Sequence, residues 1–307
     1  MSAYSDAVLA SSPMLYYRFN ETSGSVIDAS PNARHGSIVG SGVTRARPRL
    51  GPRDAGATEY SCGFSATAAA SYVQTPITTL SSVMTFELLF NASAAQTNQR
   101  GYVLGKARHY ANTQAELPLA LVYGQGLLQW QLDRGNDYIA DISIPALAQA
   151  GETHLVHAIY RSAAECELWL NGALAGKATL SGAAATNAFP ITIGGVAELT
   201  GGVGTTTLVG RIDEVAIYNT ALSESTIKAR QELRFAGSDF SGNVTKITGG
   251  PADRVIVWNW TTSHVVRVLT PSASGDWSCG LPPGDYGMTY IGTACQPVTH
   301  GPYTVTA

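Results

Sequence analysis

"GRIDEVAIYNTALSESTIKAR", residues 210–230, begins with the pattern of a strand and ends with that of a helix. Side chains alternate between the two faces of a strand, which predicts that Asp213 shares a face with Val215. Glu214 then shares the opposite face with Ile212. An acid therefore lies on an apolar face whichever face is buried. Because a buried carboxylate has to be hydrogen-bonded, ion-paired or bound to a metal, the strand predicts a polar partner inside the fold.

Short β-rich runs recur along the chain, bounded by Gly, Asn, Ser and Pro. The dipeptide Asn171-Gly172 has the residues of a tight hairpin turn. One helix pattern follows the strand of residues 210–218, and Ser223 is suited to cap its first turn. Runs of this length and spacing predict an all-β protein built as an antiparallel sandwich. They include "MLYYRF", "SYVQTP", "MTFELLF", "PLALVYG", "LLQWQL", "HLVHAIY" and "CELWLNG".

A stretch rich in Gly, Ser and Asp, "FAGSDFSGN", follows the predicted helix. This composition is typical of a linker, which we place at residues 237–242. It separates a large domain, residues 1–236, from a small one, residues 243–307. The strand patterns "RVIVWNW", "HVVRVL" and "DYGMTYIG" predict that the small domain is an Ig-like β-sandwich.

Composition argues against two classes of partner. Charged residues make up 13% of the 307 residues, about half the usual share, and the net charge is −3. The basic group from Arg45 to Arg49 is too small for a nucleic-acid-binding stripe and is predicted to be an ordinary loop. No apolar run approaches ~18 residues, so we expect no membrane insertion. Residues 1–19 lack the basic and apolar regions of a secretory signal, and we expect none.

The four cysteines are widely spaced and match no zinc pattern. Cys279 and Cys295 lie on neighbouring predicted strands and are either a disulfide or two reduced thiols. The reduced state is favoured. The other two are Cys62 and Cys166.

The segment "PMLYYRFNETSGSVIDASPNARHGSIVG", residues 13–40, carries a resemblance to a known family. With its Tyr-x-Arg strand, Glu-x-x-Gly and an Asp-rich turn ending in His-Gly, it resembles the first strands of laminin G-like domains. Residues 210–229 resemble the closing strand and helix of the same domains. The two ends occur in the expected order and at the expected separation. The resemblance implies a concanavalin A-like jelly-roll sandwich over residues 4–236.

The resemblance also gives the buried acid a role. In many laminin G-like domains the Asp of the first turn and the Asp of the closing strand lie together, often around calcium. At the matching positions these are Asp28 and Asp213, with Asn32 as a further oxygen donor, and oxygen ligands suit Ca²⁺. A second interpretation stays open, in which Asp28 forms an Asx-turn whose N–H groups donate to Asp213. Glu214 is expected to pair with an arginine.

The same fold class includes glycoside hydrolases, which need two carboxylates on one strand face. Glu165 and Glu167 have that alternation, but no third acid follows, and we predict that they line a solvated strand face. His154 and His157 are three residues apart in a strand, so they point to opposite faces and cannot share a metal. We therefore assign no catalytic residue and expect no enzymatic activity.

Trp258 and Trp260 share one strand face with Ile256 in the small domain. They are either exposed, where they could stack on sugar rings, or part of the core of a small sandwich. The core interpretation is favoured here, and Trp130 and Trp169 are expected to lie in or near the core of the large domain.

Residues 275–307, with "PPGDY" and "CQPVTHGPYTV", resemble small C-terminal domains of tail and fibre proteins of tailed bacteriophages. This implies a virion-surface protein of the tail tip, baseplate or fibre, assembled in the host cytoplasm as a homo-oligomer with other virion proteins. Its expected role is contact with a host-surface glycan or protein. The alternative is a structural decoration protein of the capsid or tail without receptor binding. A secreted carbohydrate-active enzyme would need a signal and paired acids.

Overall fold

The protein consists of two compact units, Met1–Gln231 and Glu232–Ala307. The computed structural model describes residues 2–51, 59–65, 70–93, 96, 101–110, 116–124, 127–133, 138–145, 153–162, 164–182, 187–199, 207–234, 239–244, 252–261, 263, 265–281, 284–292 and 297–305.

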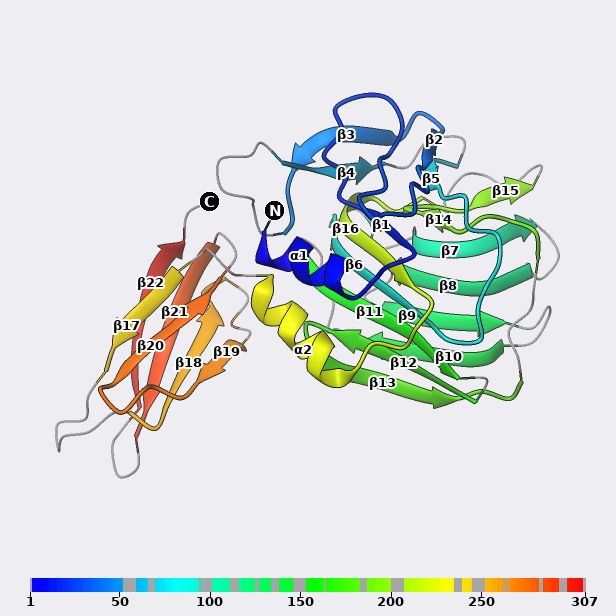
Figure 1. Ribbon diagram of the computed structural model, residues 1–307. Helices are drawn as coiled ribbons and strands as arrows, with labels where there is room; N and C mark the ends of the chain where they lie inside the picture. The colour runs from blue at the N-terminus through cyan, green and yellow to red at the C-terminus, as the bar shows by residue number, and fades with distance from the viewer. Residues whose placement is uncertain are drawn as a thin grey trace. The chain divides into compact units, whose positions relative to one another are not determined.

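The large unit contains two eight-stranded sheets (Figure 1). The first has the strand order β13-β12-β11-β6-β16-β4-β3, with β1 also paired to β16. The second has the order β10-β9-β8-β7-β14-β5-β2, with β15 paired in parallel to β7. The strands are β1 (Leu15–Tyr17), β2 (Ser37–Val39), β3 (Val43–Pro48), β4 (Tyr60–Phe64), β5 (Tyr72–Gln74), β6 (Met84–Ala92), β7 (Gly101–Tyr110), β8 (Glu116–Gly124), β9 (Leu127–Asp133), β10 (Tyr138–Pro145), β11 (Thr153–Ser162), β12 (Glu165–Leu170), β13 (Ala173–Thr179), β14 (Thr192–Ile193), β15 (Ala197–Leu199) and β16 (Gly210–Tyr218).

The core of the large unit lies between the two sheets. Phe86 on β6 and Trp130 on β9 belong to different sheets, yet their ring centroids are 5.7 Å apart. Both are fully buried in one continuous hydrophobic cluster. The predicted all-β jelly-roll sandwich is therefore confirmed, and so is the predicted core position of Trp130.

Two local predictions in this unit have opposite outcomes. Asn171 and Gly172 have φ angles of 51° and 79°, the left-handed pair that a two-residue hairpin turn requires, and they join β12 to β13 as predicted.

The prediction of a loop from Arg45 to Arg49 is wrong, because Val43–Pro48 forms β3. The backbone of this segment pairs with β4, with Arg47 opposite Ser61, and sheet pairing outweighs the low strand preference of a basic sequence.

Both helices pack on the sheet that contains β6 and β16 (Figure 1). Helix α2 (Glu224–Leu233) begins as predicted, with the Ser223 hydroxyl accepting from the N–H of Thr226 at 3.2 Å. It buries Ile227 completely. Helix α1 (Ala3–Ala10) was not predicted, and Ser2 caps it. Neither described helix has the length or the apolar composition needed to traverse a bilayer.

The small unit has a two-stranded sheet, β17-β20, and a four-stranded sheet, β19-β18-β21-β22. They enclose one hydrophobic cluster that includes Val255, Val257, Trp277 and Tyr286, which is the layer arrangement of the predicted Ig-like sandwich. The strands are β17 (Asp239–Asn243), β18 (Arg254–Asn259), β19 (Val265–Leu269), β20 (Asp276–Gly280), β21 (Gly284–Ile291) and β22 (Val298–Val305).

The predicted linker at residues 237–242 overlaps strand β17. Phe240 pairs with Cys279 and Ser241 with Ser278, so backbone pairing makes a strand from a Gly- and Ser-rich sequence. Residues 237 and 238 lie outside the described residues, as does Cys295, the predicted neighbour of Cys279. Cys62, Cys166 and Cys279 are free thiols.

Candidate functional site

Strand β16, which carries the two adjacent acids, contains a one-residue bulge. Asp213 pairs with Leu89 and Ala216 pairs with Glu87, so three steps along β16 face two steps along β6. Glu214 lies inside the bulge with a φ of 50°, in the left-handed region. The bulge reverses the alternation of side chains from that point onward.

Because of this reversal, the prediction that Asp213 shares a face with Val215, and Glu214 the opposite face with Ile212, is wrong. Ile212 and Val215 both enter the core between the sheets. Asp213 and Glu214 lie outside that hydrophobic cluster and are nevertheless fully buried. Both acids therefore need polar partners, and each has a different set.

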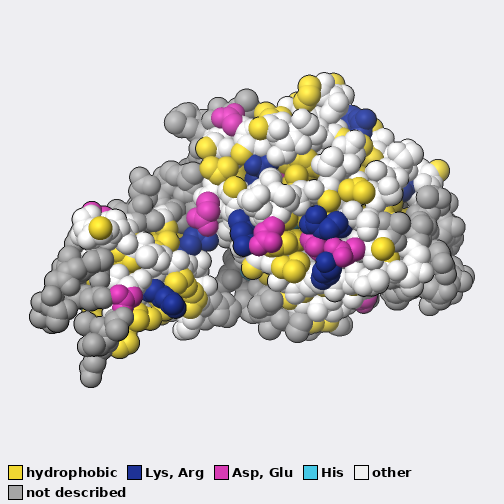
Figure 2. Space-filling model, turned by 60° about the horizontal axis from the view of Figure 1, so that its bottom comes forward, with side chains coloured by type: hydrophobic (Ala, Val, Ile, Leu, Met, Phe, Trp, Pro, Cys, Tyr) yellow, Lys and Arg dark blue, Asp and Glu magenta, His cyan; other side chains and the backbone are white. Residues whose placement is uncertain are grey.

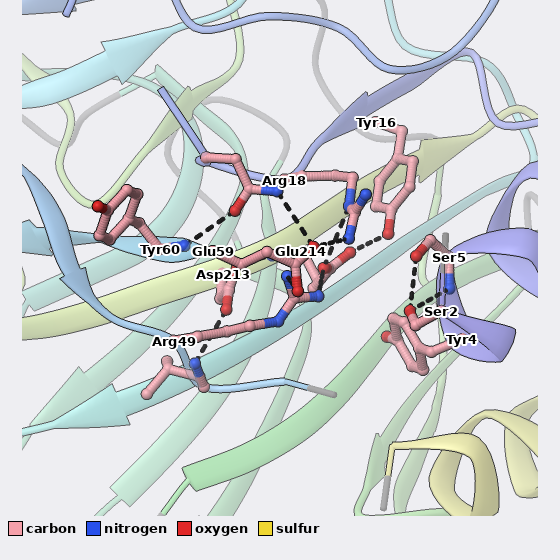
Figure 3. Close-up of polar contacts among 12 residues, drawn as sticks. Ser2, Tyr4, Ser5, Tyr16, Arg18, Arg49, Glu59, Tyr60, Asp213 and Glu214 are labelled. Carbon is pink, nitrogen blue, oxygen red and sulfur yellow. Dashed lines mark hydrogen bonds and ion pairs between the residues drawn. The ribbon is translucent and has the colours of Figure 1, made fainter. Parts of the chain in front are cut away.

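Glu214 is one corner of a ring of four alternating charges, which we call the ion-pair ring (Figure 3). Arg49 pairs with Glu214 and lies 2.5 Å from Glu59. Arg18 lies 2.5 Å from Glu59 and 3.5 Å from Glu214. Tyr16 donates its hydroxyl hydrogen to Glu214. The expected pairing of Glu214 with an arginine is confirmed.

The ion-pair ring joins segments that are distant in the sequence. Arg18 follows β1, Arg49 follows β3, Glu59 precedes β4 and Glu214 is on β16. Burial raises the pKa of the Glu214 carboxyl, and the two guanidinium groups oppose this shift because they favour the carboxylate. Two positive and two negative charges compensate one another, which is what permits their burial.

Asp213 points away from the ion-pair ring and holds the chain after Arg49 (Figure 3). Its carboxylate accepts from the N–H of Leu50 at 2.9 Å and from the N–H of Glu214 at 2.9 Å. Burial raises the pKa of Asp213 to about 6, and the nearby Arg49 and the backbone N–H groups of Leu50, Glu214 and Gly51 oppose the rise. Asp213 is therefore an acceptor for the backbone of residues 50, 51 and 214.

Asp28 organises the first turn. Its Oδ1 accepts from the N–H of Tyr16 at 2.8 Å and of Ser30 at 2.9 Å, and its Oδ2 accepts from the hydroxyl of Ser30 at 2.9 Å and the N–H of Arg34 at 2.8 Å. The bond to Ser30 N–H makes the Asx-turn that we considered. The N–H groups of this turn donate to Asp28 itself, so the prediction that they donate to Asp213 is wrong.

These contacts do not fit a calcium site formed by Asp28, Asn32 and Asp213. Two protein donors occupy each oxygen of Asp28, which fills the acceptor capacity of a carboxylate. Asn32 donates its amide N–H to the carbonyl oxygen of Pro13 at 3.1 Å. The donor sets of the two carboxylates do not overlap. In the described part of the chain, no cluster of three or more His, Cys, Asp or Glu side chains is arranged for a metal.

Another buried acid, Glu87, was not predicted from the sequence. On the same face of the sheet, Tyr4 and Tyr218 each donate a hydroxyl hydrogen to Glu87 at 2.7 Å. Nε of Arg230 lies 3.2 Å from Oε1, and Nε2 of His157 lies 3.6 Å from Oε2 of Glu87. The signal was present, because Glu87 interrupts the apolar run "MTFELLF".

We call these five residues the Glu87 cluster. Burial raises the pKa of Glu87, but His157, Arg230 and Tyr218 outweigh burial and lower it to about 2. Burial and the Glu87 charge raise the pKa of Tyr4 and Tyr218, which keeps both hydroxyls protonated as donors. The cluster joins α1, α2, β6, β11 and β16.

Glu165 and Glu167 are ion-paired, and only one of them is solvated. The side chain of Glu165 is 30% exposed and lies 2.7 Å from Lys177. Glu167 is 8% exposed, contacts Arg161 at 2.6 Å and accepts from the indole of Trp169 at 2.9 Å, so the prediction is wrong for this residue. Figure 2 shows acidic and basic side chains side by side on the large unit.

The two histidines of β11 point to opposite faces, as predicted. The ring of His154 lies 5.5 Å from that of Phe90, which belongs to the core. His157 lies in the Glu87 cluster on the other face. The two residues cannot act together on a metal.

Trp258 and Trp260 are not in the core of the small unit, unlike Trp277, which corrects the favoured interpretation. Val255 and Val257 face the core, so the alternate residues Ile256 and Trp258 face outward. Trp260 is 39% exposed. We call the outward set the tryptophan face; it consists of Ile256, Trp258, Trp260, Val265 and Val268.

The tryptophan face is the candidate functional site. The charged side chains of the ion-pair ring and of the Glu87 cluster are paired with one another inside the large unit, so they serve to hold its elements together. By contrast, Val265 is 61% and Val268 56% exposed on the tryptophan face. Exposed apolar side chains grouped on one sheet face mark an interaction surface.

Comparisons with known proteins place the large unit in a family. The profile of a laminin G family, described as the concanavalin A-like lectin/glucanases superfamily, matches residues 67–228. A search of curated protein sequences gave no match.

Solved structures with a similar fold include binding domains of toxins. The binding domain of Paraclostridial Mosquitocidal Protein 1 has a TM-score of 0.55 and 14% identity over 92% of this chain and 76% of that one. The botulinum neurotoxin serotype D binding domain has a TM-score of 0.54 and 12% identity over 96% of this chain and 71% of that one. At these identities the likeness concerns the fold alone. Because the profile covers more than half of the chain, this protein belongs to the concanavalin A-like lectin/glucanases superfamily.

Proposed function

We propose that this chain is a non-enzymatic surface protein of a tailed-bacteriophage particle that contacts a glycan or protein of the host surface. Its place is the tail tip, baseplate or fibre, where it assembles as a homo-oligomer with other virion proteins. The large unit acts as a rigid scaffold, tied together by the ion-pair ring and the Glu87 cluster.

The observation that carries this proposal is the tryptophan face. A sandwich of this size needs its large side chains for its core, yet Trp260 is 39% exposed on the opposite face. Hydrophobic side chains reach the surface of the small unit in the view of Figure 2. Leaving aromatic surface in water is unfavourable unless a ligand covers it, because the hydrophobic effect opposes such exposure.

Two further observations support the proposal. Solved structures with a similar fold include domains described as binding or receptor-binding domains of toxins. In addition, Glu165 and Glu167, the pair that would have to act as acid and base, are held in ion pairs. Arg161 and Trp169, the hydrogen-bond donors to Glu167, lower the pKa of Glu167 against the effect of burial, which makes it a poor proton donor.

The proposal is tested on particles of the phage that encodes the chain, with a gold-labelled antibody against the chain and electron microscopy. We expect label at the tail tip, baseplate or fibre. Label distributed over the capsid or along the tail would favour a decoration protein instead. Particles without label would contradict both assignments.

A further inference from the structure

We propose that the tryptophan face binds a pyranose ring of a glycan by stacking on the indoles of Trp258 and Trp260. This inference rests on the proposed function and names its ligand class. The two indole rings are already stacked on each other, with centroids 5.0 Å apart and planes 19° apart.

The register of the sheet brings the site together from four strands. Trp258 on β18 lies opposite Val265 on β19 and opposite Gly287 on β21. One row further along, Ile256 lies opposite Val268 and opposite Thr289. Thr289 in turn lies opposite Thr299 on β22. The apolar part of the face is thus on β18 and β19, and a polar part is on β21 and β22.

Two glycines give the indoles their positions. A Cβ at Gly287 would collide with the six-membered ring of Trp258, so this indole lies directly over the backbone of β21. A Cβ at Gly301 would lie 2.9 Å from the ring of Trp260, and Gly301 has a φ of 143°, which side chains rarely adopt. The absence of side chains at both positions leaves room for the two rings against the backbone of β21 and β22.

Hydroxyl groups border the aromatic surface. The hydroxyl oxygens of Thr289 on β21 and Thr299 on β22 lie 3.0 Å apart on the outward face of the four-stranded sheet. Thr304 donates to the exposed carboxylate of Asp285 at 2.6 Å. A pyranose has one face of C–H groups, which complement the negative face of an aromatic ring, and hydroxyls around its edge, which match this border. The two kinds of surface lie on adjacent strands, as such a ligand requires.

The size of the face favours a sugar over a protein partner. Trp260, Val265 and Val268 together expose on the order of 300 Å². A stable protein interface needs about 800 Å² from each partner. The face therefore suits one or two sugar rings.

The test uses the whole chain on an array of bacterial O-polysaccharides and capsular polysaccharides. We expect wild-type binding to at least one glycan and about a tenfold weaker affinity for Trp260→Ala and for Trp258→Ala. Gly287→Ala should weaken binding as well, because its methyl group displaces the Trp258 ring. Trp260→Tyr should retain part of the affinity. Leu174→Ala is the matched control, since Leu174 is a 48% exposed apolar residue of the large unit.

The outcomes separate this inference from the proposed function. Glycan binding that Trp258→Ala and Trp260→Ala leave unchanged would overturn the tryptophan face as the site while the adhesive function stands. Binding to host cells without binding to any arrayed glycan would overturn the ligand class. A wild-type chain that binds neither cells nor glycans would overturn the function too. Circular dichroism and thermal melting of each variant show that a loss of binding is not a loss of fold.

Discussion

Glu87 on β6 and Arg230 on α2 form a buried ion pair, with Nε of Arg230 3.2 Å from Oε1 of Glu87. Arg230 also donates to the carbonyl oxygen of Ala7 at 2.6 Å and to the hydroxyl of Ser11 at 2.7 Å, at the end of α1. One arginine thus fastens both helices to the sheet. This relationship explains how an acid can lie in the apolar run of β6.

Glu87→Gln should lower the free energy of unfolding by about 3 kcal/mol, because it leaves the buried Arg230 without its charge partner. Urea unfolding at pH 7 measures this. Glu224→Gln is the matched control, since Glu224 pairs with Lys228 on the exposed side of the same helix, and it should cost less than about 1 kcal/mol. Equal effects of the two substitutions would contradict the anchoring role of Glu87.

Asp213 should make stability depend on pH. Its pKa is about 6 in the folded chain and 3.8 as the unperturbed value, so between these values the folded chain binds more protons than the unfolded chain. Its contribution is fully present below pH 3.8 and is lost as the pH rises through 6. Unfolding followed from pH 4 to pH 7 should show this loss in the wild type and a flatter profile in Asp213→Asn. Identical slopes would be evidence against a raised pKa.

Removal of calcium should leave the melting temperature unchanged, because protein donors occupy both oxygens of Asp28. Asp28→Ala should nevertheless destabilise the chain by at least about 2 kcal/mol, since buried N–H groups lose their acceptor. Thermal melting with EDTA and with added CaCl₂ tests both statements. A calcium-dependent rise in melting temperature that Asp28→Ala abolishes would restore the metal interpretation.

A chain that ends at residue 236 should fold and unfold in one cooperative transition, because it keeps α2 and the contacts of Arg230 with Glu87 and with α1. A chain that ends at residue 222 loses the burial of Ile227, about 2 kcal/mol, and leaves Glu87 without Arg230. We expect the shorter chain to aggregate or melt at a much lower temperature. Calorimetry of the two fragments compares them, and equal stability would show that α2 is dispensable.

Much of the fold could be predicted because strand patterns and turn residues are local signals. The hairpin at Asn171-Gly172 and the Ser223 cap follow from single residues with defined conformational preferences. Strand β17 and strand β3 could not be predicted in this way. Their sequences are rich in Gly and Ser or in Arg, and only pairing with β20 and β4 makes them strands.

The candidate site was harder to predict because it depends on face assignments. A single bulged residue, Glu214, reverses the alternation of side chains along β16, and the local sequence contains no signal that predicts this bulge. The faces of β18 follow a period of two, but the sequence does not say which face is covered. Trp277 and Tyr286, supplied by other strands, complete the core and leave Trp260 in solvent.

The most direct test of contact with a host-surface glycan is the binding of the labelled whole chain to host cells, measured by flow cytometry before and after mild periodate oxidation of the cell surface. Periodate cleaves the diols of sugars, so our account predicts strong binding to untreated cells and a large loss after oxidation. Protease treatment of the cells should leave the binding in place. Binding that survives periodate and disappears with protease, or no binding to untreated cells, would contradict the claim that the chain contacts a host-surface glycan.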